Sequence, residues 1–309
     1  MRIIFMGTPD FAVPSLKILL KSGYEVVAVI TATDKMGGRG KNKLIQSAVK
    51  QFAVAHDLHV LQPKNLKAPS FVEELRALKA DLQVVVAFRM LPEVVWNMPP
   101  LGTINLHGSL LPKYRGAAPI NWAVINGEKE TGVTTFLLQQ EIDTGDLLLQ
   151  KSIDIGENET AGEVYNRMME MGAGVLLETV QLLASGNYAT TAQDASKATK
   201  APKIFHETCE IDFVRNTAAI HDFIRGLSPY PTAWTIIEEK KLKIFKTQKE
   251  LKTHSFNAGT FISDNKSFLK VATLDGFVHL LELQLAGKKR MKTKDFLNGY
   301  TLTAVADPE

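Results

Sequence analysis

Short apolar runs alternate with helix-like stretches through the first part of the chain. Residues 2–6, 24–31 and 82–88 are predominantly apolar runs of strand length, and residues 11–20, with Pro14 near their start, have the spacing of a helix. Strands that are apolar on both faces and are separated by helices are typical of a parallel sheet covered on both sides. We therefore predict an α/β fold with a Rossmann-like, mostly parallel sheet and helices on both faces.

The other elements of this part are predicted in the same way. We expect helices at 44–56, 70–78, 119–126 and 161–184, and strands at 102–107 and 131–138. The segment 34–43 is rich in glycine and lysine and is predicted to be a loop.

The character of the sequence changes near residue 186. Residues 186–206 are small, polar and weakly periodic, which is typical of a linker. After a helix at 216–225, short strand-like runs suggest a small, OB-like β-barrel; they lie at 233–237, 242–245, 268–272 and 278–285. We predict a catalytic domain at 1–189, a linker at 190–206 and a C-terminal β-barrel domain at 207–309.

Composition narrows the class of protein. The chain has 309 residues and a formal net charge of +3, which permits a nucleic-acid partner without requiring one. Its single cysteine, Cys209, excludes an internal disulfide and fits a reducing compartment. The flanking Glu207 and Glu210 should raise the pKa of this thiol, so we expect no nucleophilic role for it. The start of the chain has no signal-peptide pattern, and no apolar run is long enough for a membrane span, so we expect a cytoplasmic protein.

A pair of polar side chains interrupts the predicted strand at 102–107. Asn105 and His107 alternate with Ile104 and Leu106, so the two polar groups share one face and the two aliphatic groups share the other. Ligands bind beyond the carboxyl ends of strands in open α/β sheets. A hydrogen-bonded core histidine is the simpler interpretation of His107, but two neighbouring buried polar groups would cost several kcal/mol unless they were satisfied. Asp143, in the turn-like segment Asp-Thr-Gly-Asp, can direct a carboxylate toward the same end of the sheet.

Other chemistries are poorly supported. Ser109 lies in His-Gly-Ser-Leu-Leu and not in the Gly-x-Ser-x-Gly elbow of a serine hydrolase. His56 and His59 are the only closely spaced pair of histidines, and no cysteine is near them, so we expect no metal. Neither Gly-x-Gly-x-x-Gly nor a Walker sequence occurs. An asparagine, a histidine and an aspartate suit the transfer of an activated one-carbon or acyl unit, because such an enzyme positions two substrates, moves a proton and stabilises an oxyanion.

These residues carry a resemblance. Asn105-x-His107, Ser109-Leu-Leu-Pro112 and Asp143-Thr-Gly145 resemble the motifs of the folate-dependent formyltransferase superfamily. Further similar segments run along the whole chain; they are Ile4-Phe-Met-Gly-Thr-Pro-Asp-Phe11, His107–Ile120, and Ser228-Pro-Tyr-Pro231 with Trp234. Two others, Gly38-Arg-Gly-Lys41 and Ala286-Gly-Lys-Lys289, resemble the branch whose acceptor is initiator methionyl-tRNA.

The resemblance implies a reaction and a role for each residue. The expected donor is 10-formyltetrahydrofolate and the expected acceptor is the free amino group of methionyl initiator tRNA. Asn105 would donate a hydrogen bond to the developing oxyanion, His107 would stabilise it and move the amine proton, and Asp143 would orient and charge the imidazole. The folate would lie between the strand ending at Phe88 and the turn after His107; the expected contact residues are Phe88, Arg89, Met90, Leu91, Ser109, Leu110, Leu111 and Pro112.

The folate segment departs from the family pattern. The pattern has Ala-Tyr-Gly, two apolar residues and Leu-Pro, whereas this chain has Ala87-Phe-Arg-Met-Leu-Pro92, apparently one residue shorter. An apolar strand end followed by a turn explains the same residues almost as well.

Basic residues point to an RNA partner. The loop 34–43 carries Arg39, Lys41 and Lys43, and the C-terminal part carries Lys288 and Lys289 beside a second lysine-rich run at 240–252. A single lysine run is usually only a solvated face, but a basic loop together with two such runs suggests a phosphate-tracking surface. We predict that the tRNA contacts are made by Arg39, Lys41, Lys43, Lys288 and Lys289. We also predict that the chain acts as a monomer.

Two alternatives stay open. The chain could formylate a small amine such as an amino sugar nucleotide, because that branch shares the His-Gly-Ser-Leu-Leu-Pro core. It could also be a non-catalytic protein that binds folate or RNA.

Overall fold

The computed structural model describes residues 1–37 and 43–306, and the chain divides into two compact units. Each unit combines segments that are distant in the sequence. The first unit comprises Met1–Gly116, Gly132–Ile153 and Tyr165–Lys200; the second comprises Ala117–Thr131, Asp154–Val164 and Ala201–Glu309. The predicted division at 1–189, 190–206 and 207–309 stays a prediction.

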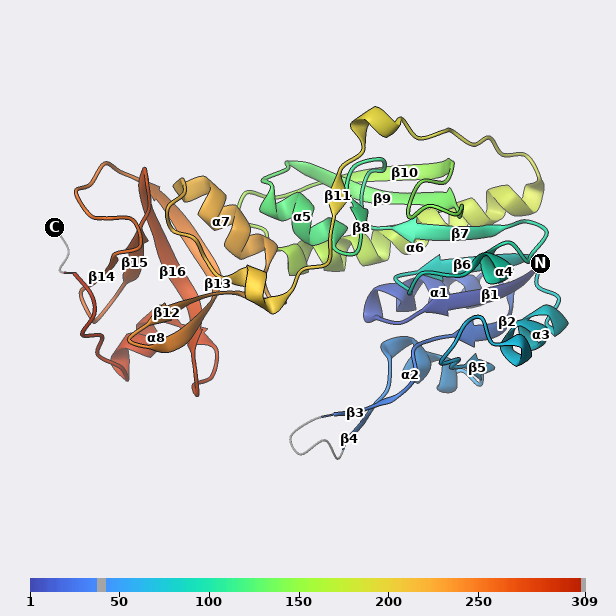
Figure 1. The fold of residues 1–309 in the computed structure, drawn as a ribbon, viewed down its shortest axis with the longest axis horizontal. Helices are drawn as coiled ribbons and strands as arrows, with labels where there is room; N and C mark the ends of the chain where they lie inside the picture. Colours follow the sequence, from blue (N-terminus) through green and yellow to red (C-terminus); the bar gives the residue numbers. More distant parts are fainter. Residues whose placement is uncertain (38–42, 307–309) are drawn as a thin grey trace. The chain divides into compact units, whose positions relative to one another are not determined.

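A seven-stranded sheet forms the centre of the first unit (Figure 1). Its strand order is β10-β9-β7-β6-β1-β2-β5. Strand β1 pairs in parallel with β2 and β6, β2 with β5 and β6 with β7, whereas β7 and β9 are antiparallel. The strands are β1 (Arg2–Gly7), β2 (Glu25–Ile30), β5 (Val60–Leu61), β6 (Leu82–Val86), β7 (Thr103–His107), β9 (Glu130–Leu137) and β10 (Leu147–Asp154). The predicted mostly parallel α/β sheet is confirmed.

Helices cover both faces of this sheet. One face packs on α3 and α4 through a core that includes Ile4, Phe71 and Val95. Of the helices that the structure describes, none is both long enough and apolar enough to cross a membrane. The helices are α1 (Val13–Lys21), which follows the 3-10 turn η1 (Asp10–Ala12), α2 (Ala48–Val54), α3 (Pro69–Ala77), α4 (Glu93–Trp96) and α6 (Ala161–Ser185).

Strand β7 separates its side chains as the alternation predicts. Leu106 faces α6, because a Cβ built on Gly172 of that helix would lie 3.0 Å from a Leu106 methyl carbon. Thr135, the partner of Leu106 in β9, hydrogen-bonds Thr179 of α6 at 2.7 Å. Asn105 and His107 therefore project from the opposite face, on the side of the sheet away from α6.

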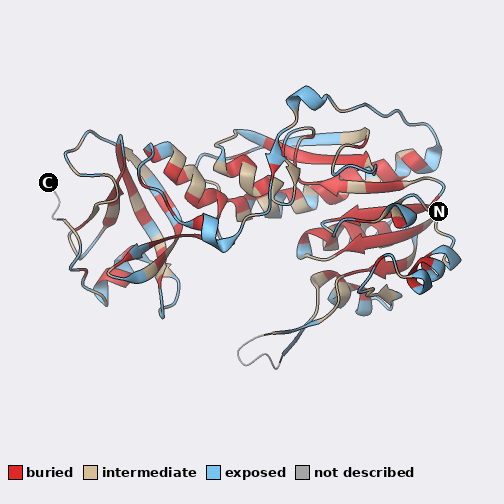
Figure 2. Cartoon of the chain, in the orientation of Figure 1, coloured by how far each residue is buried: buried red, intermediate tan, exposed pale blue. Residues whose placement is uncertain are grey.

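The second unit is built on a curved antiparallel sheet. Its six strands run in the order β12-β13-β16-β15-β14, with β17 beside β16, and form a half-barrel. Its strands and helices are β12 (Ala233–Ile237), β13 (Lys240–Leu251), β14 (Phe261–Ser263), β15 (Leu269–Ala272), β16 (Gly276–Leu285), β17 (Met291–Lys292), α5 (Pro119–Ile125), α7 (Thr217–Gly226) and α8 (Thr293–Asn298). Figure 2 shows buried positions concentrated on these strands and on α7. Helix α7 closes one core through Ile220 and Ile224.

The segment between β2 and α2 differs from its prediction. The predicted loop at 34–43 contains strand β3 (Lys35–Gly37), and the predicted helix at 44–56 starts with strand β4 (Lys43–Ile45). The two strands pair as an antiparallel hairpin. Helix α2 begins only after Ser47, whose hydroxyl accepts a hydrogen bond from the backbone N–H of Lys50 at 3.0 Å, as an N-cap does.

Two helix glycines give opposite expectations for stability. A Cβ built on Gly226 of α7 would lie 2.5 Å from Cγ1 and 2.7 Å from the backbone nitrogen of Ile125 in α5, so Gly226→Ala should lower the free energy of unfolding by about 1–3 kcal/mol. Gly174 of α6 has no such neighbour within 4 Å, so Gly174→Ala should raise it by about 0.5–1 kcal/mol. Thermal unfolding of the two variants checks this pair; melting temperatures that shift in the same direction would contradict the packing between α5 and α7.

Candidate active site

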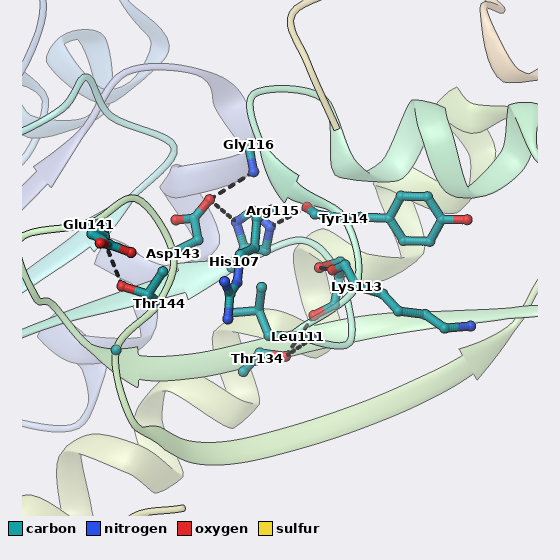
Figure 3. Close-up of polar contacts among 12 residues, drawn as sticks. His107, Leu111, Lys113, Tyr114, Arg115, Gly116, Thr134, Glu141, Asp143 and Thr144 are labelled. Atoms are coloured by element: carbon teal, nitrogen blue, oxygen red, sulfur yellow. Dashed lines mark hydrogen bonds and ion pairs between the residues drawn. The ribbon is translucent and has the colours of Figure 1, made fainter. Parts of the chain in front are cut away.

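His107 ends strand β7 and approaches polar atoms through both ring nitrogens (Figure 3). Nε2 lies 2.9 Å from the carbonyl oxygen of Tyr114, and because a carbonyl oxygen only accepts hydrogen bonds, Nε2 carries a hydrogen here. Nδ1 lies 3.8 Å from Oδ2 of Asp143. The side chain is only 7% exposed, so the ring orientation is set by these two neighbours.

Asp143 lies in a turn whose shape depends on glycine. Its backbone has φ +56°, a left-handed conformation that costs an L-residue about 1–2 kcal/mol. Its Oδ2 accepts a hydrogen bond from the backbone N–H of Gly116 at 2.8 Å. A Cβ built on Gly145 would lie 1.6 Å from the carbonyl oxygen of Leu137, so only glycine fits at that position. The shape of the turn therefore requires the glycine of Asp143-Thr-Gly145, in addition to any chemical role of Asp143.

The loop after β7 is held by two side chains that the sequence pattern did not indicate, the buried Thr134 of β9 and the exposed Gln150 of β10. The Thr134 hydroxyl donates to the carbonyl of Ser109 at 2.6 Å and accepts from the backbone N–H of Leu111 at 3.1 Å. Gln150 donates to the carbonyl of Leu111 at 2.8 Å and to the Thr134 hydroxyl at 2.9 Å. Register is the only signal that could have indicated Thr134, because it is the direct partner of His107 in the β7–β9 pair.

The loop also closes on itself. The Ser109 hydroxyl donates to the carbonyl of Lys113 at 2.6 Å, and Tyr114 adopts a left-handed conformation with φ +62°. This turn directs the Tyr114 carbonyl toward His107. Ser109 is completely buried and hydrogen-bonded in this way, so it supports the loop and is not presented as a nucleophile.

Asn105 lies two positions before His107 on the same face and is partly exposed. Among residues 1–37 and 43–306 its carboxamide has no hydrogen-bond partner. Partly buried amides are normally hydrogen-bonded, so a carboxamide without a partner beside an ordered histidine is a candidate for contact with a substrate.

The segment predicted to contact folate after β6 is divided between core and solvent. Ala87 turns the chain with φ +48°, after which Phe88 and Leu91 pack against the core shared with α3 and α4. Met90 is 75% exposed. The Arg89 guanidinium lies 5.7 Å from the Phe88 ring centre and donates to the carbonyls of two residues of the neighbouring loop, Pro63 and Lys64.

The second predicted folate segment follows β7. Leu111 is buried, whereas Leu110 and Pro112 are half-buried. Because β6 and β7 are adjacent and parallel, with Val86 opposite Leu106, their carboxyl ends meet at one edge of the sheet. The structure therefore brings both predicted folate segments to the edge at which His107 lies, although Leu91 and Leu111 point into the core.

The predicted linker takes part in this site. The side-chain Nε2 of Gln193 donates to the backbone carbonyls of Asp143 and Gly145, and its side-chain Oε1 accepts from the Arg115 guanidinium. Thr199 accepts a hydrogen bond from the backbone N–H of Tyr114 through its hydroxyl at 2.8 Å. Small polar residues in a weakly periodic segment carry no signal of such contacts.

A pocket of about 320 Å³ lies elsewhere in the first unit. Its lining includes Asp81, Gln83 and Met98, which lie at the amino ends of β6 and β7. This is the sheet edge opposite to His107. This pocket and the converging polar groups thus lie at different edges of the sheet, and the polar groups make the His107 edge the candidate active site.

The remaining candidate residues, His56 and Cys209, make contacts that a structural role explains. In the part of the chain that the structure describes, no three His, Cys, Asp or Glu side chains gather as metal ligands. His56 stacks on Phe52 and bonds its carbonyl through Nδ1 at 2.9 Å. Burial, followed by the charge of Glu207, raises the pKa of the Cys209 thiol, as predicted.

Only some of the basic residues predicted to contact tRNA lie in the described part of the chain. Arg39 and Lys41 lie outside the described residues. Lys43 is exposed on β4. The base of this hairpin is anchored by Asp34, which bonds Lys50 at 2.5 Å; that hydrogen bond holds the pKa of the Asp34 carboxyl below its ordinary value.

Lys288 and Lys289 are exposed in the turn between β16 and β17. Other basic side chains of the second unit pair with carboxylates, as in Lys249–Glu157 at 2.9 Å and Arg290–Glu282 at 2.7 Å. Neither lysine of the turn has such a partner within residues 1–37 and 43–306. Their charge is therefore available to a ligand.

Family models match both parts of the chain. One described as "Formyl transferase" matches residues 1–180, and one described as "Formyl transferase, C-terminal domain" matches residues 203–301.

Curated bacterial relatives match nearly the full length. A protein named methionyl-tRNA formyltransferase from Parabacteroides distasonis is 56% identical over 97% of this chain and 96% of its own. Proteins of the same name from Bacteroides thetaiotaomicron and Flavobacterium johnsoniae are each 51% identical over 98% of this chain and 97% of their own.

Solved structures share the fold at lower identity. A sugar 3N-formyl transferase solved in the presence of dTDP and 5-N-formyl-THF has a TM-score of 0.70 and 21% identity, covering 94% of this chain and 99% of that one. An N-formyltransferase from Helicobacter canadensis, in complex with folinic acid and dTDP-3-aminofucose, has a TM-score of 0.70 and 22% identity, covering 90% and 98%. At these identities the likeness shows the fold alone.

The surroundings of Cys209 predict an unreactive thiol. The residue is 0% exposed and the pKa of its thiol is raised, so little thiolate forms and none of it is accessible. The folded protein should fail to react with a thiol-specific chromogenic disulfide at mildly alkaline pH, and the protein unfolded in denaturant should release one equivalent of dye for its single cysteine. Rapid reaction of the folded protein would contradict the burial of Cys209.

Proposed function

Because the chain belongs to the formyl transferase family, we propose that it transfers the formyl group of 10-formyltetrahydrofolate to the free amino group of methionyl initiator tRNA. The observation that carries the reaction is the end of β7, where the partnerless Asn105 carboxamide lies beside the His107–Asp143 pair. The acceptor is inferred from the full-length similarity to relatives named methionyl-tRNA formyltransferase.

The reaction exchanges one carbon–nitrogen bond for another. The uncharged amine attacks the formyl carbon, a new carbon–nitrogen bond forms, and the carbonyl electrons move to oxygen. When the carbonyl returns, the bond to N10 of the folate breaks, the amine nitrogen loses a proton and N10 gains one. The protein must therefore stabilise an oxyanion and move one proton.

Asn105 supplies the oxyanion contact. No described residue engages its N–H donors, so they are available to an oxygen at the strand end without breaking an existing bond. A donor fixed on a strand before the reaction needs little reorganisation when charge develops.

His107 and Asp143 carry out the proton transfer. The Tyr114 carbonyl holds Nε2, and Nδ1 faces the carboxylate, so the ring has one defined orientation. Asp143 orients this ring and stabilises positive charge on it while the amine proton moves.

The residues at the carboxyl ends of β6 and β7 fit a folate. The exposed Met90 and half-buried Phe88 offer apolar surface, and the loop backbone near Leu110 can meet polar edges of a ring system. We include all eight residues in the proposed site; they are Phe88, Arg89, Met90, Leu91, Ser109, Leu110, Leu111 and Pro112. No metal is required for the transfer.

The exposed cations supply the tRNA contacts. Lys288 and Lys289 have no carboxylate partner among the described residues, so they can contact phosphates without first breaking an ion pair there. Arg39, Lys41 and Lys43 belong to the same proposal at the acceptor end of the tRNA. We propose that residues 207–309 form the tRNA-binding domain and that a monomer acts in the cytoplasm, where translation begins.

Substitution of the reacting pair should separate catalysis from folding. Asn105→Ala removes an oxyanion donor, which typically costs roughly 3–4 kcal/mol of transition-state stabilisation, so formyl transfer to methionyl initiator tRNA should slow by about 100-fold or more. His107→Ala should do the same. Circular dichroism should show folded protein, and the exposed control variants Asn187→Ala and His59→Ala should keep full activity.

The acceptor is tested in the same assay. Formylation of an amino sugar nucleotide in preference to methionyl-tRNA would replace the proposed acceptor, and near-normal turnover by Asn105→Ala or His107→Ala would remove the proposed site.

The proposed phosphate contacts predict a steep salt dependence. Binding of methionyl initiator tRNA should weaken linearly on a plot of log affinity against log salt. The double variant Lys288→Glu with Lys289→Glu should bind more weakly and reduce the steepness of that plot by about 1 for each phosphate that the protein no longer neutralises. Lys266→Glu, which reverses an exposed charge in the turn between β14 and β15, is the control. A flat salt response in the wild type, or equal effects of both changes, would contradict these contacts.

A further inference from the structure

We propose that Gln193 is a positioning residue for formyl transfer: its carboxamide fixes the turn that carries Asp143 against the loop that carries the other contact of His107. This inference rests on the proposed function, because it assigns a role in that same active site. Gln193 lies in the segment whose composition predicts only a linker.

The carboxamide of Gln193 uses all of its hydrogen-bonding capacity. Nε2 donates to the carbonyl of Asp143 at 2.9 Å and to the carbonyl of Gly145 at 2.8 Å. Oε1 accepts from Nε of Arg115 at 3.1 Å and from Nη2 at 2.7 Å. Two donors and two acceptor sites are thus each matched, which only a carboxamide in this orientation can do.

These bonds join the two segments that hold His107. The imidazole bonds the Tyr114 carbonyl on one side and faces the Asp143 carboxylate on the other. Arg115 directly follows Tyr114, and Gly116 donates its N–H to Asp143. Gln193 therefore closes a ring of contacts around the imidazole without touching it.

The conformation of Asp143 explains why such a contact is needed. Its left-handed backbone, with φ +56°, is unfavourable for a residue with a side chain. A donor on the Asp143 carbonyl and a second on Gly145 hold the peptide groups of this turn. Without them the turn could relax to a more common conformation, and the carboxylate would leave the Gly116 N–H and His107.

Gln193 is itself held at both ends of its segment. Thr191 exchanges two backbone hydrogen bonds with Leu147, at 2.8 and 3.0 Å. Thr199 accepts from the backbone N–H of Tyr114 through its hydroxyl and from that of Arg115 through its carbonyl, at 2.8 and 2.9 Å. The segment 191–199 is therefore hydrogen-bonded to β10 at one end and to the loop after β7 at the other.

Two substitutions separate the functions of the carboxamide. Gln193→Glu keeps an acceptor for Arg115 but replaces the two N–H donors by an oxygen facing two carbonyls. Gln193→Met keeps the approximate length of the side chain and removes the acceptor oxygen as well as the two N–H donors. Gln181→Glu is the charge-matched control, because Gln181 is exposed on α6 and its side chain has no hydrogen-bond partner among the described residues.

A positioning role predicts a specific kinetic pattern. Both Gln193 variants should lower kcat by roughly tenfold or more, with the KM for each substrate within about twofold of wild type, because Gln193 reaches only the protein. Adding Gln193→Met to Asp143→Asn should slow the reaction no further than Asp143→Asn alone, because Gln193 acts through Asp143. A KM effect, or multiplicative losses in the double variant, would overturn the proposal.

A readout without substrate completes the experiment. The Gly116 amide, whose proton bonds Asp143, should exchange with solvent at least about tenfold faster in Gln193→Glu and Gln193→Met than in wild type, as measured by NMR, while Gln181→Glu leaves it unchanged. Unchanged Gly116 protection in an enzyme that formylates methionyl-tRNA would overturn the positioning role and leave the proposed function standing. Faster Gly116 exchange in a protein that formylates nothing would overturn the proposed function instead.

Discussion

The geometry of the active site depends on one carboxylate oxygen. Oδ2 of Asp143 accepts the Gly116 N–H at 2.8 Å and lies 3.8 Å from Nδ1 of His107. This single atom connects the turn after β9 with the loop after β7, so it contributes both to the position of the loop and to the orientation of the imidazole. Because the carboxylate belongs to a residue in an unfavourable backbone conformation, the surrounding contacts must hold it there.

Around this atom, regular strands and irregular segments make different contributions to the site. The parallel strands β6 and β7 end side by side and carry Phe88, Asn105 and His107 to one edge of the sheet. The irregular segments contribute the remaining contacts, through backbone groups whose direction depends on left-handed residues such as Tyr114 and Asp143. Two polar side chains, the buried Thr134 of β9 and the exposed Gln150 of β10, then hold the loop against the sheet. Such support gives a site the precision that loops alone lack.

The local pattern of apolar and polar residues predicts the strands of this arrangement and the faces of their side chains. Largely apolar runs identify β1, β2 and β6, and alternation in the segment that forms β7 places Asn105 and His107 on one face. The β3–β4 hairpin was missed because Met36, Leu44 and Ile45 are apolar yet exposed, so no burial pattern marks their strands. Gln193 was missed for another reason. Its partners Asp143 and Arg115 lie 50 and 78 positions away, and polar contacts over such separations leave no local period.

The central claim is that Asn105, His107 and Asp143 promote direct transfer of a formyl group to an amine on methionyl-tRNA. The most direct measurement is a single-turnover reaction of the purified protein with 10-formyltetrahydrofolate and charged initiator tRNA, in which both products are quantified. Direct transfer should give N-formylmethionyl-tRNA and tetrahydrofolate in equal amounts. Release of tetrahydrofolate without formylated tRNA, or formation of neither product, would contradict it.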